Sequence, residues 1–286
     1  MSLIWKGWSL GLTIFGLILV AFALIWLFAI FPIMAKMPAD YENEYMFEGF
    51  IKQFDQETMS LVETPTSVER LLEATDTQDN VVLIKQDINF YHAEFGVLLE
   101  DVCTSELLGV DRSTRENVPD CKDADIVRSG QFTFPAGVKK ENYDFWSSST
   151  MCALPAQYIG EEQFEGLTVY NFRIEAQDVN YGTDEATGLP RTMDLLTEIK
   201  VEPTSGVPVD TTTTTTIKMN MGQGPMPVYI NSMSFTDDTI AEMVDTASSG
   251  RNMILWATVY GFWIALGLGA ALTLGGVIMA ARTQAD

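Results

Sequence analysis

Two long apolar runs, one near each end of the chain, dominate its pattern of hydrophobic and polar positions. Residues 7–35 carry no charged side chain over 29 positions, and residues 252–281 carry none over 30 positions. As helices that rise about 1.5 Å per residue, both runs exceed the roughly 30 Å hydrocarbon core of a bilayer. The first run is also longer than the apolar core of a signal peptide, which is about 7–15 residues. We therefore expect two membrane helices, the first of them an uncleaved anchor.

Between the two runs, short segments rich in β-branched and aromatic residues alternate with polar turns. In residues 165–176, the even positions from Thr168 to Ile174 would share one face of a strand. Pro203 and Gly206 supply the chemistry of a tight turn between two further strands. The six consecutive threonines at 211–216 suit an extended strand, with an O-glycosylated stalk as the alternative. The pattern predicts an antiparallel, β-rich domain.

A short amphipathic helix is expected just before the second run. Thr236 can cap its N-terminus, and the two aspartates that follow suit the positive end of the helix dipole. Ile240, Met243 and Val244 form an apolar stripe with i, i+3, i+4 spacing. Residues 248–250, Ser-Ser-Gly, are then expected to break this helix and to form a hinge to the second membrane helix.

Small residues recur at a four-residue spacing inside the second run. Gly261, Ala265 and Gly269 would lie on one face of a helix and let another helix approach closely. Gly7 and Gly11 repeat this spacing at the start of the first run. The pattern favours a tight pair between the two membrane helices or between chains of a homo-oligomer. The alternative is that these glycines are ordinary, because glycine is common in membrane helices.

These elements predict a membrane-anchored, mainly β protein of the α+β type with three parts. Residues 1–36 would be a cytoplasmic tail and the first membrane helix, 37–250 an extracytoplasmic acidic domain, and 251–286 the second helix and a cytoplasmic tail. Basic residues differ little between the two sides of the membrane. The N-terminal amine tips the balance toward both termini inside the cell, in a two-pass protein of the plasma membrane.

The charge of the chain is concentrated in its middle. The net charge is −22, and only Lys6, Lys36, Arg251, Arg282 and Asp286 lie outside residues 37–250. The middle therefore holds 13 basic and 38 acidic residues, a net charge of −25. Such a domain repels nucleic acid and anionic headgroups. It suits cationic partners or, more simply, solubility in salty surroundings.

Three cysteines all lie in this middle part. Cys103 and Cys121 flank a polar, loop-like segment, and we expect them to form a disulfide, for which Cys152 is a competing partner. No pair of cysteines has the CxxC spacing, and His92 is the only histidine. A zinc site is therefore not expected.

The candidate catalytic and binding motifs are weak. His92 lies in an aromatic, strand-like stretch and lacks the partners of a catalytic triad. The Gly-Gln-Gly at 222–224 lacks the strand–helix context of a dinucleotide site. The aspartates of residues 120–125 and 178–185 do not have the spacing of a calcium loop. We expect no catalytic residue, cofactor or metal, and hence no enzyme.

Several segments together resemble the porin PorA-like family of actinobacteria and archaea. The resemblance is carried, in order, by FTFPAGVKKENYDFWSSST, ALPAQYIGEEQFEGLTVYNF, IKVEPTSGVPVD and FTDDTIAEMVDTA, with a weaker match in MPADYENEY and FDQETMSLVE. It implies two membrane helices that flank an extracytoplasmic β-rich domain, in which the segment from Cys103 to Cys121 looks like an insertion. The layout is also similar to that of two-span class B scavenger receptors, a likeness of topology alone.

The expected function is non-enzymatic. We expect a cell-surface protein whose anchored domain binds a ligand or supports the cell envelope. One alternative is a conduit or receptor for lipid or another small apolar molecule, and another is a subunit of an oligomeric pore, because two helices cannot enclose a channel. The expected partners are the lipid bilayer, a lipid or cell-envelope ligand and further copies of the chain, with no nucleic acid.

Overall fold

The computed structural model describes residues 7–55, 57–220, 222 and 224–283, which divide into two compact units. One unit consists of residues 37–248. The other brings together the chain up to residue 36 and the chain from residue 249 onward. The first unit is a β domain, and the second is a pair of helices.

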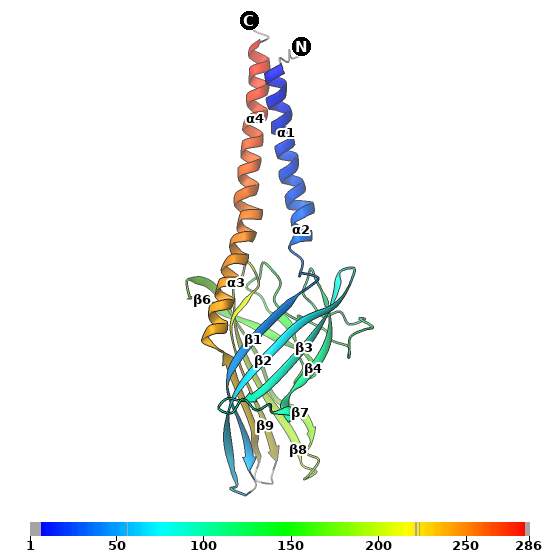
Figure 1. The fold of residues 1–286 in the computed structure, drawn as a ribbon, viewed down its shortest axis with the longest axis vertical. Coiled ribbons are helices and arrows are strands. Elements are labelled where there is room, and N and C mark those ends of the chain that lie inside the picture. The colour runs from blue at the N-terminus through cyan, green and yellow to red at the C-terminus, as the bar shows by residue number, and fades with distance from the viewer. Residues whose placement is uncertain (1–6, 56, 221, 223, 284–286) are drawn as a thin grey trace. The chain divides into compact units, whose positions relative to one another are not determined.

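In the described chain, ten antiparallel strands form the sheet of the β domain (Figure 1). They are β1 (Glu42–Asp55), β2 (Ser60–Gln78), β3 (Val81–His92), β4 (Thr104–Asp111), β5 (Tyr143–Ser147), β6 (Cys152–Phe164), β7 (Leu167–Thr183), β8 (Pro190–Val201), β9 (Pro208–Asn220) and β10 (Pro225–Phe235). Their order across the sheet is β4-β3-β2-β1-β10-β9-β8-β7-β6-β5. The prediction of a mainly β, antiparallel domain is confirmed, while its anchoring to a membrane stays a prediction.

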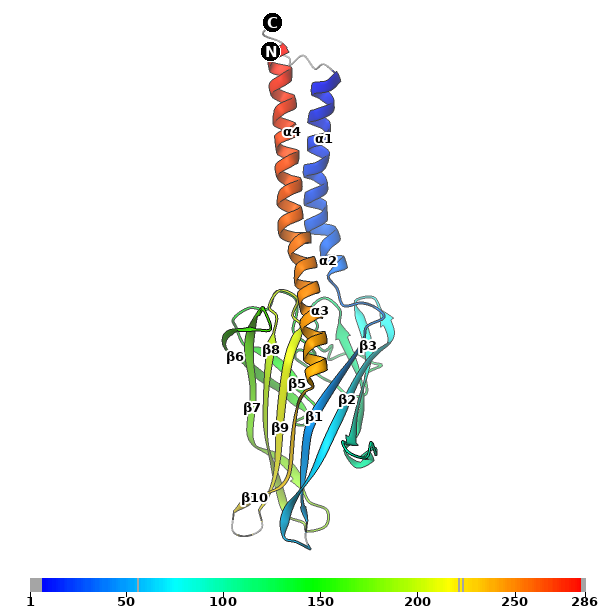
Figure 2. The ribbon, with the colours of Figure 1, turned by 60° about the vertical axis from the view of Figure 1, so that its left-hand side comes forward.

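The sheet is curled, and its two ends differ (Figure 2). At one end, which we call the base, β1 begins and β10 ends, because Phe47 pairs with Phe235. At the other end, the tip, lie the turns that join β1 to β2, β7 to β8 and β9 to β10. The threonine run lies within β9 and pairs with both β8 and β10, as expected of β-branched residues.

The two edge strands, β4 and β5, are linked to each other through the long connection between them. Isolated bridges join Val110 to Asn117, Glu116 to Gln131, and Gln131 to Phe145. The connection thus pairs with both edges. Because unpaired edge strands are templates for association with other chains, this link satisfies two otherwise open edges.

A buried arginine strengthens the link between the edges. Arg128 is 3% exposed, and its Nη1 donates to the Leu107 carbonyl at 3.2 Å and to Asp125. Its Nη2 lies 3.5 Å from Glu106 Oε2, and its guanidinium lies 5.8 Å from the centre of the Trp146 ring. Burial alone would raise the pKa of Asp125, but hydrogen bonds from Arg128 and backbone N–H groups hold it below its usual value. Arg128 therefore ties β4 to β5.

Two clusters of apolar side chains fill the base. The first consists of Met37, Tyr45, Leu72, Val82, Ile84, Leu108, Val110, Phe235 and Met243. The second is built on aromatic rings: the ring centre of Phe134 lies 4.5 Å from that of Phe145 and 4.6 Å from that of Phe172. Full burial of each such side chain contributes about 1.5–3 kcal/mol. The base is thus the stable core of the domain.

The two faces of β7 are both buried near the base. Phe172 and Ile174 belong to the second cluster, as the alternation predicts. Leu167 and Val169, on the opposite face, pack with Val209 in a further cluster that includes residues of helix α3 (Asp237–Leu255). The sequence suggests one buried face because alternation does not show that a helix covers the other.

Helix α3 begins as predicted but does not end as predicted. The Thr236 hydroxyl accepts the N–H of Thr239 at 3.2 Å, so Thr236 is the N-cap. Met243 is buried and Ile240 packs beside it, whereas Val244 packs in the cluster of Leu167 and Val169. The helix then continues through residues 248–250, so the predicted break is wrong. A single glycine inside a helix costs only about 1 kcal/mol, too little to end it.

The second unit consists of two helical segments. The N-terminal one comprises α1 (Gly7–Ile25), the π-helical turn η1 (Trp26–Ile30) and α2 (Phe31–Met34), and the C-terminal one continues from α3 through the π-helical turn η3 (Trp256–Tyr260) into α4 (Gly261–Thr283). Among the described residues, Gly7–Met34 and Asp237–Arg282 are helices long and apolar enough to cross a membrane. The expectation of two long apolar helices is confirmed, and their crossing of a membrane stays a prediction.

Helices α1 and α4 run side by side (Figures 1 and 2). Small side chains form the seam between them. On α1, Ser9, Thr13, Gly16 and Ala23 are buried. A side chain at Gly16 would collide with Thr273, and one at Gly276 would collide with Thr13. The Thr13 and Thr273 hydroxyls donate within their own helices, to the carbonyls of Ser9 and Gly269. The seam positions alternate in steps of four and three, the pattern of a left-handed helix pair.

Of the three small residues predicted for helix packing, Gly269 lies at the centre of this seam. A Cβ atom there would come within 2.8 Å of the Gly16 carbonyl oxygen. Ala265 and Gly261 instead line a small cavity of about 260 Å³ beside Trp26 and Trp256. Gly7 and Gly11 have no atom within 4 Å of such a Cβ. For Gly261, Ala265 and Gly269, a role in helix packing inside a membrane remains a prediction.

We predict that Gly269→Leu destabilises the helix pair. The added side chain would overlap the α1 backbone, and overpacking of this kind costs about 1–3 kcal/mol. Thermal unfolding of the full chain in detergent should therefore occur at a lower temperature. Gly267→Leu is the matched control, because a Cβ at Gly267 meets nothing within 4 Å. Equal melting temperatures for the two variants would contradict the seam.

Candidate ligand-binding cavity

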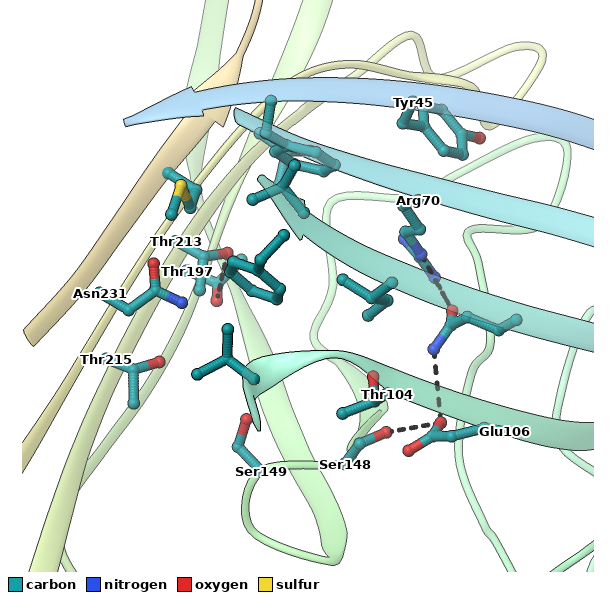
Figure 3. A pocket seen from close by; sticks show the side chains of 18 of the residues that line it. Tyr45, Arg70, Thr104, Glu106, Ser148, Ser149, Thr197, Thr213, Thr215 and Asn231 are labelled. Carbon is teal, nitrogen blue, oxygen red and sulfur yellow. Dashed lines mark hydrogen bonds between the residues drawn. The ribbon is translucent and has the colours of Figure 1, made fainter. Parts of the chain in front are cut away.

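The concave side of the curled sheet holds a cavity of about 1000 Å³ that is partly open to solvent (Figure 3). Side chains of β1, β2, β3, β4, β5, β8, β9 and β10 line it, together with Tyr181 of β7 and residues of the loops beside β5. The cavity adjoins the apolar clusters of the base. Tyr45, Leu72 and Phe235 belong to the first cluster and also form part of the cavity wall. The cavity is therefore the unfilled continuation of the core.

The threonine run provides one wall of the cavity. Because side chains alternate along a strand, Thr211, Thr213 and Thr215 face inward. Thr212 and Thr214 face the other way, and their hydroxyls are 3.0 Å from those of Ser234 and Ser232 on β10. The run thus decorates both faces of β9 with hydroxyl groups.

This wall carries polar groups that are only partly satisfied. The hydroxyls of Thr197 and Thr213 are 3.2 Å apart (Figure 3). The Oδ1 atom of Asn231 is buried and has no hydrogen-bond partner among the described residues. Burial, and secondarily the neighbouring Tyr181, raise the pKa of Tyr229 to about 12, so its phenol remains a neutral hydrogen-bond donor. A buried acceptor without a partner is a place for a donor on a ligand or a water molecule.

The facing wall carries a charged network (Figure 3). Arg70 on β2 donates through Nε and Nη2 to Gln86 Oε1, at 2.9 and 2.6 Å. Gln86 in turn donates to Glu106 Oε2 at 3.3 Å, and the Ser148 hydroxyl donates to the same oxygen at 2.9 Å. The network crosses three neighbouring strands and ends at the ion pair with Arg128.

Tyr45 adjoins this network at the base. Its ring stacks on Phe235, with ring centres 5.5 Å apart and planes 3° from parallel. Burial raises its pKa well above the ordinary value, with a further contribution from Tyr41, while the Arg70 charge opposes the shift. Its hydroxyl accepts a hydrogen bond from Asn43 at 2.9 Å. Tyr45 therefore stays neutral and closes the base end of the cavity.

An apolar stretch lies between the charged network and the polar wall. Ile51, Val68 and Met233 are buried together. Packed against them are Phe47, Ile88, Phe90, Leu99, Val102 and Tyr229. Most of these side chains also line the cavity. The interior therefore offers an apolar surface with distinct polar groups at its borders, which is the character of a small-molecule site.

The chemical motifs considered from sequence lie outside this arrangement or have structural partners. The His92 ring lies 4.5 Å from that of Phe95, and its Nδ1 accepts the Glu94 N–H. Asp125 binds Arg128, and Asp178 binds Lys218 at 2.7 Å. In the described part of the chain, no three His, Cys, Asp or Glu side chains group in a way that would hold a metal. Gln223, in the Gly-Gln-Gly motif, falls outside the described residues.

The predicted disulfide between Cys103 and Cys121 is not formed, and all three cysteines are free thiols. Cys103 Sγ accepts the Phe90 N–H and donates to the Leu99 carbonyl, just before β4. Cys121 lies against Gly109, six residues farther along β4 and thus roughly 20 Å away. A disulfide needs Cα atoms within about 7 Å. Cys152, at the start of β6, is exposed and contacts Thr150.

Arg70 is the site residue that the sequence reasoning missed. It lies between Val68 and Leu72, which are both buried on the inner face of β2. A period of two therefore places Arg70 on that same inner face. A charged residue at the same alternating positions as buried apolar residues is the sequence signal that would have indicated its inward orientation.

Comparison of the sequence with known protein families agrees with this architecture. A family model described as Porin PorA matches residues 8–278, nearly the whole chain. A search of curated proteins finds no match. The matched range covers nearly all of both apolar helices and the whole of the curled sheet with its cavity. The chain belongs to the porin PorA family.

Proposed function

We propose that the β domain is a membrane-tethered binding module that takes an elongated amphipathic molecule into its interior cavity. The cavity is the observation that carries this proposal. Its volume of about 1000 Å³ lies at the upper end of the range of about 300–1000 Å³ for small-molecule sites. A solid core would instead favour a purely structural role in the envelope.

The lining indicates the kind of molecule. The wall of β1, β2 and β3 is largely apolar, with Phe47, Val68 and Phe90 facing inward. The opposite wall presents the threonine hydroxyls and Asn231. A ligand that is apolar along one side or over part of its length would match both walls. Such a molecule would come from a membrane, which fits the alternative of a lipid conduit or receptor.

The membrane arrangement is part of the same proposal. The family and the two apolar helices suggest a membrane protein. We propose that Gly7–Met34 and the apolar part of Asp237–Arg282 both span the plasma membrane. Both termini would then be cytoplasmic, and the acidic domain would be extracytoplasmic. The strongly negative charge of residues 37–250 supports a domain surrounded by water rather than one lying on anionic headgroups.

We also propose that the protein is not an enzyme. A porin family points toward a non-enzymatic protein. Around the cavity, Arg70 and Glu106 both form hydrogen bonds with Gln86 on the strand between them, and His92 lies in contact with Phe95. A binding role needs no further chemistry from these groups.

A second candidate function is a subunit of an oligomeric pore. The family name favours it. Because each chain contributes only two apolar helices among its described residues, a channel would require several chains. The seam between α1 and α4 leaves the other faces of both helices free to contact further copies.

Filling the cavity should weaken ligand binding. Thr213→Phe places a ring inside, and we expect the half-saturating concentration of a photoreactive long-chain alcohol to rise at least about tenfold, or about 1.4 kcal/mol. The measurement is mass spectrometry of labelled peptides from the full chain in phosphatidylcholine nanodiscs. Thr214→Phe is the matched control, because residue 214 faces outward. Equal labelling of cavity peptides in both variants would refute the binding proposal.

The proposed topology predicts that protease added to intact cells digests the β domain. Lys139 is 75% exposed and offers trypsin an accessible site. Residues 37–250 should be cut while the apolar segments stay with the membrane. If protease cleaves the domain only after the cells are permeabilised, the domain is cytoplasmic and the proposed orientation is wrong.

The pore candidate predicts discrete conductance steps in planar bilayers. Oligomeric fractions should conduct, and monomeric fractions should not, because two helices cannot enclose a channel. An oligomer that stays silent under a range of voltages would eliminate the pore and leave the binding module.

A further inference from the structure

Arg70 is a cation of the cavity wall whose contacts are all neutral. Its two side-chain hydrogen bonds both end on the Gln86 amide oxygen, and its guanidinium lies 5.8 Å from the centre of the Tyr45 ring. In the part of the chain that the structure describes, it forms no ion pair. A half-buried guanidinium with neutral partners is poorly compensated for its lost hydration, and an anion would compensate it.

The other charges of the lining have different environments. Glu106 is separated from Arg70 by the Gln86 amide, and its carboxylate is already bound by Ser148 and paired with Arg128. Arg191 lies 3.9 Å from Asp184 and faces the Tyr181 ring. Asp101 is exposed to solvent. Arg70 is thus the lining cation that is available to a ligand.

An apolar track leads away from Arg70 toward the tip. Val68 is the next inward residue of β2, and it pairs with Phe47 of β1 and Phe90 of β3. Inward positions of β1 continue from Tyr45, beside Arg70, to Gln53, eight residues farther and thus roughly 26 Å away. A charged group at Arg70 would therefore place an attached chain along the length of the cavity.

Resting on the binding function proposed above, we propose that Arg70 recognises the anionic group of an amphipathic ligand. The ligand is then a long apolar chain with a carboxylate or phosphate at one end. The anion accepts hydrogen bonds from the guanidinium at the base, and the chain lies against Val68, Phe90 and Met233. Residues 37–250 as a whole carry a net charge of −25, so the attraction for the anion is confined to the neighbourhood of the Arg70 guanidinium.

The test compares a photoreactive long-chain fatty acid with the alcohol of the same length. The full chain is held in phosphatidylcholine nanodiscs, and labelling of cavity peptides is measured against probe concentration. We expect Arg70→Gln to raise the half-saturating concentration of the acid about tenfold, since hydrogen bonds to charged groups are the stronger ones. The alcohol should label both proteins equally. Its labelling also shows that the variant retains its fold.

Arg173→Gln is the matched control. It removes the same charge from an exposed ion pair with Glu198 on the outer face, and it should leave both probes unaffected. Lysophosphatidic acid should compete with the fatty acid, and inorganic phosphate should not.

Three results would overturn the role of Arg70. They are equal half-saturation of the acid in wild type and Arg70→Gln, an equal loss in Arg173→Gln, and competition by inorganic phosphate as effective as that by the lipid. If neither the acid nor the alcohol labels the cavity, the binding function itself fails, which is a distinguishable outcome.

Discussion

One buried guanidinium holds the two edges of the curled sheet together, and the interior depends on that closure. Arg128 contacts a backbone carbonyl and a carboxylate of β4, a carboxylate of the long connection and the indole of β5. Removal of one partner from a buried ion pair usually costs about 3–5 kcal/mol, because the remaining charge is left uncompensated. Without this link, β4 and β5 would be edge strands with no contact between them. The sheet would then lose the curl that bounds the cavity.

The interior of the curled sheet has a region filled by side chains and a region left open. In both regions, every second residue of a strand faces inward. Near the base, inward positions of the strands carry large apolar side chains such as Phe145, Phe172 and Phe235, and they close-pack. Toward the tip, the inward positions of β9 are threonines, which are too small to meet across the curl. The same alternation that builds the core therefore leaves the space unfilled. Close packing at the base and open space toward the tip are thus both built from one sheet.

Part of this architecture could be predicted from the sequence. The uncharged lengths of residues 7–35 and 252–281 indicate two apolar helices, and the alternation around Phe172 indicates strands. Two kinds of feature were beyond reach. The pairing of Cys103 with Cys121 assumed that nearness along a loop means nearness in space, but β4 extends between them. The predicted helix break at Ser248–Gly250 is wrong because one glycine destabilises a helix too little to end it. The cavity depends on the curl and on long-range register, which no local pattern encodes, although the phase of Arg70 with Val68 and Leu72 does show that its side chain faces inward.

The pairing of the first strand with the last has a consequence for how the chain is made. Because β1 pairs with β10, about 180 residues separate two neighbouring strands, and one side of β1 has no partner until Pro225–Phe235 has been synthesised. The strands β1 to β4 can pair among themselves early, but their sheet keeps an open edge through most of translation. During biogenesis the growing chain therefore depends on protection of the β1 edge, and ribosome-bound chains that stall before β10 are the species most prone to aggregate.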